Sequence, residues 1–256
     1  TREEVGAAYR QARDRFQTVL SELMAELPEL RRLVPADWSP EGVIAARMAR
    51  AVRPHTEEFV TPMAAVAGSV ADEVMSTMVQ GRNIAKAYIN NSGDIAVYLT
   101  PGETLRLGIV SELFNPTAGG TADIAFEQPV RGIATSGWQG RSLSFGIADA
   151  VTVLAKSAAA ADVAATLIAN AVNADHPAID RVPASSLDDD TDLGDRLVTV
   201  AVGDLDMTTI NAALDAGAIV ARRIETAGNI VAAALFLRGE KRVVGVTSVS
   251  AFVTSA

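Results

Sequence analysis

The 256-residue sequence contains no cysteine. This absence excludes disulfides, zinc–thiolate sites, iron–sulfur clusters held by the chain's own thiolates and cysteine nucleophiles. Histidine is almost as scarce, since His55 and His176 are the only two, and they are too far apart in sequence to form a local metal-binding motif. A chain without cysteine suits a reducing compartment, so we expect a cytoplasmic protein.

Basic residues and long apolar runs are also in short supply. The chain has 22 Lys and Arg against 31 Asp and Glu, for a formal net charge of −9. This charge disfavours nucleic acids and anionic membranes as partners. Lys156, Asp162 and Asp206 interrupt the most apolar stretches, so none offers the run of about 20 apolar residues that a membrane span needs. The charged N-terminal stretch does not resemble a signal peptide.

Apolar residues at helical spacing predict several long helices. In residues 2–33, Val5, Tyr9, Phe16 and Leu20 recur between charges, as is typical of an amphipathic helix. Further helices are predicted over residues 41–52, 63–79, 158–175 and 207–227.

Short β-branched runs, separated by Pro and Gly, fill residues 83–157 and return at 196–202, 229–237 and 241–249. The predicted fold class is α+β, with mostly antiparallel sheets packed against long helices. We expect a single domain over residues 1–256. The Asp-rich loop at 185–195 is a candidate boundary for a C-terminal βαββ subdomain from about 196 to 250.

The predicted helix at 158–175 is apolar except for one stripe, made of Asp162, Thr166, Asn170 and Asn173. At about 100° per residue these side chains share one face. A buried carboxylate is costly unless it is paired or binds a cation. Asp162 and Thr166 together offer hard oxygen ligands suited to Mg²⁺. On the pattern alone, a stripe that faces solvent or caps a neighbouring loop is the favoured interpretation.

The loop "ATSGWQGRS" has the components of an anion-binding site: hydroxyls at Thr135 and Ser136, glycines at Gly137 and Gly140, and the cation Arg141. A tight hairpin turn would need the same glycines, so both interpretations stay open. His55 is a further catalytic candidate, although a lone histidine is more often a surface or core residue.

Four stretches in order resemble an uncharacterised prokaryotic family allied to ApbE, the FAD:protein FMN transferase. They are "TPMAAVAGSVADEV" (61–74), "NNSGDIAVYL" (90–99), "TSGWQGRSLSFGIADAV" (135–151) and "AADVAATLIANAV" (160–172). The resemblance covers about residues 50–175 and implies an ApbE-like fold. It also implies that Asp162 and Thr166 ligate Mg²⁺ beside a flavin diphosphate. By the same resemblance, Asn91, Gly93 and Asp94 would lie near the site.

The sequence departs from the transferases at positions that matter for their chemistry. Their lysine has no counterpart in "GSVADEV" (68–74), and no His-x-x-Asp-Pro segment follows the Ser136–Gly137 turn. Arg141 stands where the uncharacterised family is expected to have histidine. Arginine cannot act as a general acid or base near neutral pH, but its planar fork suits phosphate or carboxylate. An active FMN transferase is therefore not expected.

Together these features predict an enzyme or enzyme component with a Mg²⁺-assisted pocket for FAD, FMN or another anionic small molecule. Its catalytic candidates are His55, Ser136 and Arg141. Two alternatives stay open. One is a reductase of a small heteroaromatic ring, which would need a redox partner protein because the chain has no cysteine for a cluster. The other is a non-catalytic ligand-binding subunit. A homodimer or other homo-oligomer is also left open.

Overall fold

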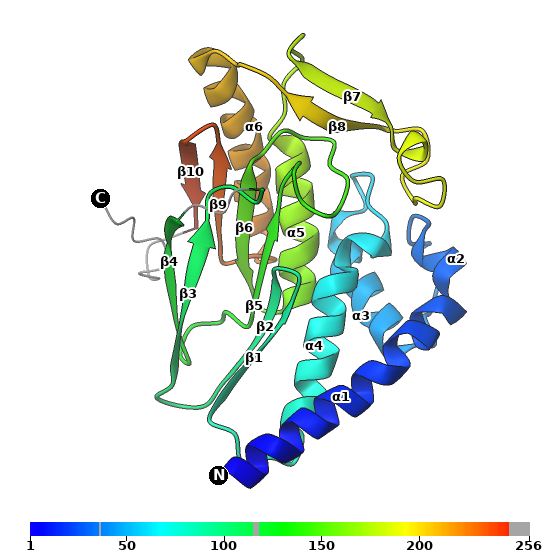
Figure 1. Cartoon of the computed structure of the whole chain (residues 1–256), viewed down its shortest axis with the longest axis vertical. Helices are drawn as coiled ribbons and strands as arrows, with labels where there is room; N and C mark the ends of the chain where they lie inside the picture. The colour runs from blue at the N-terminus through cyan, green and yellow to red at the C-terminus, as the bar shows by residue number, and fades with distance from the viewer. Residues whose placement is uncertain (36, 115–117, 246–256) are drawn as a thin grey trace. The chain divides into compact units, whose positions relative to one another are not determined.

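The structure is a computed structural model that describes residues 1–35, 37–114 and 118–245 (Figure 1). The chain divides into two compact units. Unit 1 comprises Thr1–Leu105, Ala125–Ala134 and Ala155–Val163. Unit 2 comprises Arg106–Ile124, Thr135–Leu154 and Ala164–Ala256. The predictions of a single domain and of a C-terminal subdomain stay predictions.

Unit 1 begins with α1 (Arg2–Ala25), which Thr1 caps by accepting a hydrogen bond from the N–H of Glu4 at 3.3 Å. The single helix predicted over residues 2–33 is wrong, because a separate short helix, α2 (Leu27–Leu30), follows α1. Pro28 lies in the first turn of α2, where its missing N–H is tolerated, but it could not continue α1. The remaining helices of this unit are α3 (Val43–Val52), η1 (Arg53–His55), η2 (Pro62–Ala65) and α4 (Val66–Val79).

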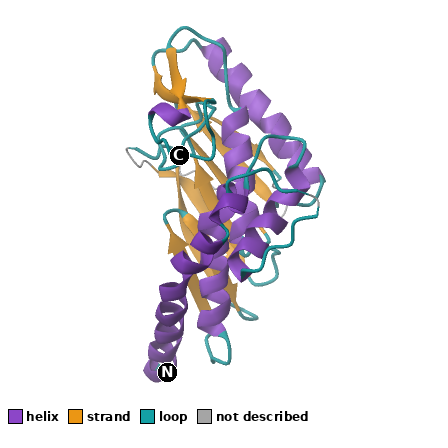
Figure 2. Ribbon diagram, turned by 90° about the vertical axis from the view of Figure 1, so that its right-hand side faces the viewer, coloured by secondary structure: helices purple, strands orange, loops and turns teal. Residues whose placement is uncertain are grey.

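The strands of unit 1 form a hairpin that α4 covers. β1 (Lys86–Asn91) pairs antiparallel with β2 (Asp94–Leu99), and β2 pairs with β5 (Gly132–Ser136) through Ile95 and Ile133. Ser92 and Gly93 form the two-residue loop, both with positive φ (61° and 107°), as tight hairpins require. α4 packs against β1 and β2, and α1 and α3 pack against α4 (Figures 1 and 2).

Most of unit 2 is built around three antiparallel strands, β6 (Ala150–Ala155), β9 (Ala232–Leu237) and β10 (Glu240–Val244). Every residue of β6 and β9 is buried. α6 (Met207–Thr226) packs against β9 and β10. α5 (Ala158–Ala171) begins in unit 1 and ends in unit 2.

Two further ribbons complete the described chain. β3 (Thr104–Val110) pairs with β4 (Ala118–Ala125), and β7 (Ile179–Pro183) pairs with β8 (Leu197–Val202), with η3 (Ala184–Ser186) between them. β7 lies outside the strands predicted from the sequence, because its pairing with β8 compensates for a weak local pattern. The α+β prediction, with antiparallel sheets packed against helices, is confirmed. Residues 246–249 of the last predicted strand lie outside the described residues.

Within the described ranges, none of the helices combines the length and the apolar character needed to cross a membrane.

Candidate functional site

In unit 1 the first turns of α4 and α5 are each capped by a carboxylate from the other helix. The N–H groups of Ala158 and Ala159, at the start of α5, donate to Asp72 of α4 at 3.0 and 2.9 Å. The N–H of Gly68, in the first turn of α4, donates to Asp162 of α5 at 2.9 Å. The first N–H groups of a helix have no partner within the helix and favour negative charge. Each aspartate therefore stabilises the start of the neighbouring helix.

Glycine makes this reciprocal capping sterically possible. A Cβ atom at Gly68 would overlap the carbonyl oxygen of Ala158, and one at Gly132 would overlap the backbone between Ser157 and Ala158. Both positions therefore need a residue without a side chain, so that the backbone can approach the start of α5 closely. This packing requirement explains the glycine of the stretch "AVAGSVADEV".

The β1–β2 hairpin brings a third aspartate to the same place. Asp94 is the first residue of β2, directly after the hairpin loop. Asn91, the last residue of β1, donates from Nδ2 to the carbonyl oxygen of Ala67 at 3.1 Å. The next residue, Gly68, is the one whose N–H donates to Asp162. Asp94 and Asp162 are close enough for the charge of Asp162 to act on Asp94. We call Asp72, Asp94 and Asp162 the unit 1 acidic cluster.

All three carboxyl groups hold protons more tightly than usual. Burial raises the pKa of Asp94 to about 9, and the negative charge of Asp162 adds to the rise. Burial also raises the pKa of Asp162 to about 7; the N–H groups of Gly68 and Ala67 oppose this rise, and the charge of Asp72 adds to it. Burial raises the pKa of Asp72 despite its two N–H donors and the charge of Arg47. At neutral pH Asp94 is therefore protonated and Asp162 is near its midpoint.

A buried hydroxyl lies in the same turn of α4. Ser69 is fully buried, and within the described ranges its Oγ has no hydrogen-bond partner. Ser69 follows Gly68 directly and precedes Asp72 by three residues, so it is close to the acidic cluster on α4. An unpaired buried hydroxyl is costly, by about 1–3 kcal/mol, which makes it a candidate contact for a bound ion or ligand.

The donor set at the cluster fits a cation that needs few protein ligands. Among the described residues, no group of three or more His, Cys, Asp or Glu side chains is arranged to hold a metal ion. Mg²⁺ often binds through only one or two carboxylates and completes its shell with water and ligand phosphates. Asp94 and Asp162 are carboxylates of the kind that such an open Mg²⁺ site uses, and two carboxylates are too few for a closed structural metal site.

The rest of the polar stripe on α5 has a structural role in unit 2. The predicted helix over 158–175 ends earlier, at Ala171, so Asp162, Thr166 and Asn170 lie on α5 and Asn173 lies just after it; all four are half-buried. Asn170 accepts hydrogen bonds from the hydroxyl of Ser144 and the N–H of Phe145, both at 3.0 Å, and Asn173 donates to the carbonyl of Phe145 at 2.9 Å. The loop-capping interpretation is correct for these two asparagines. Thr166 lies one turn after Asp162, and its metal role stays a prediction.

The predicted anion loop, also in unit 2, is a closely packed turn. The hydroxyls of Thr135 and Thr152 are hydrogen bonded at 2.9 Å, and a Cβ atom at Gly137 would lie 2.7 Å from the carbonyl oxygen of Asp149. Close approach of two backbone segments therefore accounts for Gly137 without a ligand. Ser136 is half-buried and Arg141 is exposed. Their roles in anion binding stay predictions.

The structure brings together only some of the predicted site residues. Asn91, Gly93, Asp94 and Asp162 share one part of unit 1. His55 is buried in η1 of the same unit, and its catalytic role stays a prediction. Thr135, Ser136, Gly137, Arg141 and Thr166 belong to unit 2. Sequence reasoning missed the capping role of Asp72, because its partners in α5 are more than 80 residues away and no local pattern marks them.

Comparison with known proteins identifies the family to which the chain is similar. A family model described as AbpE bacteria matches residues 1–243. The chain is 44% identical over 115 residues to a UPF0280 protein of Methanosphaerula palustris, covering 44% of this chain and 47% of that protein. It is 37% identical over 172 residues to a UPF0280 protein of Methanothermobacter thermautotrophicus, covering 60% and 61%. A UPF0280 protein of Methanoculleus marisnigri is 33% identical over 180 residues, covering 65% and 71%. The chain thus spans about half to two thirds of these curated relatives.

Proposed function

Because the chain belongs to the family described as AbpE bacteria, and because unit 1 holds two neighbouring, half-buried carboxylates, we propose that it is an enzyme or enzyme component that binds an anionic small molecule with the help of Mg²⁺. A flavin nucleotide, FAD or FMN, is the first candidate ligand, as the resemblance to ApbE implies. The observation that carries the proposal is that Asp94 lies close to Asp162 beside the first turn of α4.

Two carboxylates that share a poorly hydrated place repel each other unless a proton or a cation lies between them. Burial is the main cause of the raised pKa values of Asp94 and Asp162, and repulsion adds to it, from the charge of Asp162 on Asp94 and from the charge of Asp72 on Asp162. A divalent cation removes the repulsion more effectively than one shared proton and binds to hard oxygen atoms. Asp94 and Asp162 would hold Mg²⁺, and Thr166 stays a further candidate ligand.

A cation bound by Asp94 and Asp162 would also offset the repulsion between the acidic cluster and an anionic ligand. The chain carries a formal net charge of −9, so a phosphorylated ligand that approaches the acidic cluster alone is repelled. When bound, Mg²⁺ would supply the positive charge that holds phosphate groups. Asn91, tied to Ala67, would keep the hairpin loop with Asp94 in place.

Proton release on Mg²⁺ binding tests this proposal. At pH 8, Asp94 is protonated in the free protein, so Mg²⁺ should displace up to about one proton per site. Calorimetric titrations of Mg²⁺ in two buffers of different ionisation enthalpy, with and without FAD, measure that number. Asp94→Asn and Asp162→Asn should each weaken Mg²⁺ binding at least about tenfold, and Asp94→Asn should abolish proton release.

Asp215→Asn is the matched control, because Asp215 is an exposed aspartate that pairs with Arg242 on the surface of unit 2. It should bind Mg²⁺ as the parent does. Equal Mg²⁺ affinity in all four proteins would contradict the proposal. If FAD binds and remains unreacted in the presence of Mg²⁺ and candidate electron donors, the chain is a ligand-binding subunit rather than an enzyme.

A further inference from the structure

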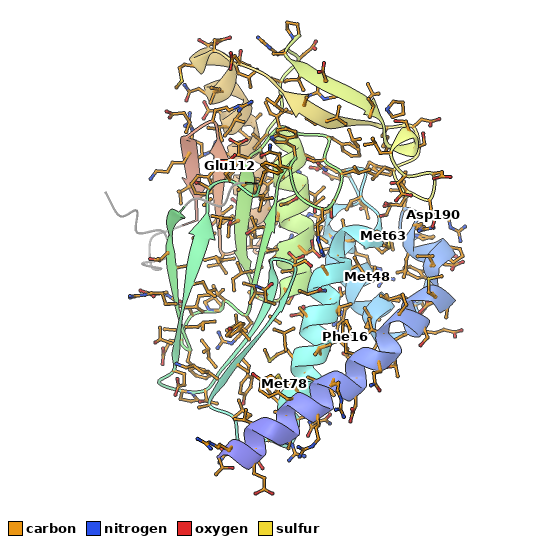
Figure 3. All side chains as sticks on the ribbon, in the orientation of Figure 1. Phe16, Met48, Met63, Met78, Glu112 and Asp190 are labelled. Carbon is orange, nitrogen blue, oxygen red and sulfur yellow. The ribbon has the colours of Figure 1, made fainter. Side chains whose placement is uncertain are left out.

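The longest helix of unit 1 exposes its large apolar side chains and buries its small ones. Ala8, Ala12 and Val19 of α1 are buried. Five larger apolar side chains of the same helix are exposed, and we call them the α1 stripe: Val5 (44% exposed), Tyr9 (64%), Phe16 (59%), Leu20 (71%) and Met24 (55%). At about 100° per residue these five lie on one face. Phe16 is labelled on α1 in Figure 3.

Polar contacts with α4 fix this orientation of α1. Gln11 donates from Nε2 to the carbonyl of Thr77 at 2.7 Å, and Arg15 donates from Nε to Glu73 at 3.0 Å. Glu73 is among the few buried charged residues of the chain. Turning the α1 stripe inward would break these bonds and leave Arg47, which donates to Glu73 at 2.9 Å, as the remaining cation at that buried carboxylate. The loss of Arg15 from a buried charge pair is unfavourable. The outward position of the stripe is therefore a stable feature of unit 1.

Four of the five residues of the α1 stripe form a self-complementary pattern. Tyr9 and Phe16 are equally far from the midpoint between Ala12 and Arg13, and so are Val5 and Leu20. A two-fold axis at that midpoint would place Tyr9 against Phe16 of a second copy, and Val5 against Leu20, with the two helices antiparallel. Such an interface uses the same patch on both copies, as two-fold dimers do.

The exposed apolar area of the α1 stripe is large enough for contact with a second copy of the chain. If each of the ten stripe side chains in a pair loses about 100 Å² of exposed surface, the interface buries on the order of 1,000 Å², the lower end for specific association. Exposed apolar patches of several hundred Å² usually mark interaction sites. Arg13 and Asp14, next to the midpoint of α1, are exposed and pair with each other at 2.9 Å, so they add no net charge at the proposed two-fold axis.

We propose that the α1 stripe is the interface of a homodimer in which α1 pairs antiparallel with α1 of a second copy. This inference does not depend on the proposed ligand site. Light scattering after size-exclusion chromatography tests the association, with the mass expected at twice 26.7 kDa. The double variant Phe16→Glu/Leu20→Glu should elute as a folded monomer with the circular dichroism spectrum of the parent, because both side chains are exposed in the single chain. Ile219→Glu, at a residue of α6 that is 62% exposed, should remain a dimer.

Disulfide crosslinking tests the direction of the pairing. Because the sequence has no native cysteine, only the introduced cysteines can form a disulfide. In the antiparallel arrangement, a mixture of Tyr9→Cys and Phe16→Cys chains should form a disulfide-linked heterodimer much faster than either variant alone. Rapid linking of Tyr9→Cys to itself would indicate a parallel pair and overturn the proposal. A monomeric parent, a dimeric double variant or binding of α1 to lipid vesicles instead of a second copy would overturn it as well.

Discussion

Asp94 is the residue whose ionisation most affects the stability of unit 1. Its pKa rises from 3.8 in the unfolded chain to about 9 in the folded protein, so the folded state binds the proton more tightly. The free energy of unfolding gained from this protonated carboxyl is fully present below the unfolded pKa. It is lost as pH rises toward the folded pKa. In the absence of Mg²⁺, unit 1 should therefore lose stability between about pH 4 and pH 9.

Asp94→Asn tests this single-residue effect, because asparagine cannot ionise. We expect the free energy of unfolding of the parent, measured by urea denaturation with a chelator present, to fall by about 1–3 kcal/mol from pH 5 to pH 9. Solvent near the half-buried side chain keeps the loss below that expected from the full pKa shift. The fall should be markedly smaller in Asp94→Asn and unchanged in Asp215→Asn. Parallel pH profiles for the parent and Asp94→Asn would refute the assignment.

At the scale of elements, the reciprocal capping of α4 and α5 couples two helix starts. Asp72 accepts from two N–H groups of α5, and removal of its carboxylate would leave both without that partner in a largely buried place. Capping residues contribute about 0.5–2 kcal/mol when exposed, and buried unpaired N–H groups add to the cost.

Asp72→Ala should therefore lower the free energy of unfolding by about 2–4 kcal/mol. Asp206→Ala offers a matched comparison, since Asp206 caps α6 by accepting from the N–H of Thr209 at 2.9 Å at an exposed site. Its loss should be about 1 kcal/mol. Denaturant unfolding of both variants at pH 7 measures the difference. A loss for Asp72→Ala no larger than that for Asp206→Ala would mean that the caps act as ordinary surface caps.

At the scale of the whole molecule, the family resemblance and its departures lead to a prediction about activity. The chain lacks the lysine and the His-x-x-Asp-Pro segment of the FMN transferases. When it is incubated with FAD, Mg²⁺ and an acceptor protein of such a transferase, the acceptor should stay free of covalent flavin. An active transferase run in parallel provides the positive control. Flavin fluorescence on the denatured acceptor would show that the missing residues are not needed.

The sequence by itself determined the order and type of most elements. Helical spacing located α4, α5 and α6, and β-branched runs bounded by Gly and Pro located β1, β2, β6 and β9, because these patterns follow from local geometry and from burial on one face. Where the local pattern was weak or misleading, as in β7 or at Pro28, the predicted boundaries were wrong.

Only the tertiary structure decided which polar groups meet and which apolar face is covered. Asp94 and Asp162 are 68 positions apart, and their raised pKa values arise from burial and from the charges of neighbouring aspartates that no local pattern brings together. The α1 pattern predicts an amphipathic helix. In the structure α1 packs against α4 with Ala8 and Ala12 buried, and the larger side chains of the α1 stripe are exposed. Local spacing sets which side chains share a face, whereas packing between distant segments determines whether that face is buried.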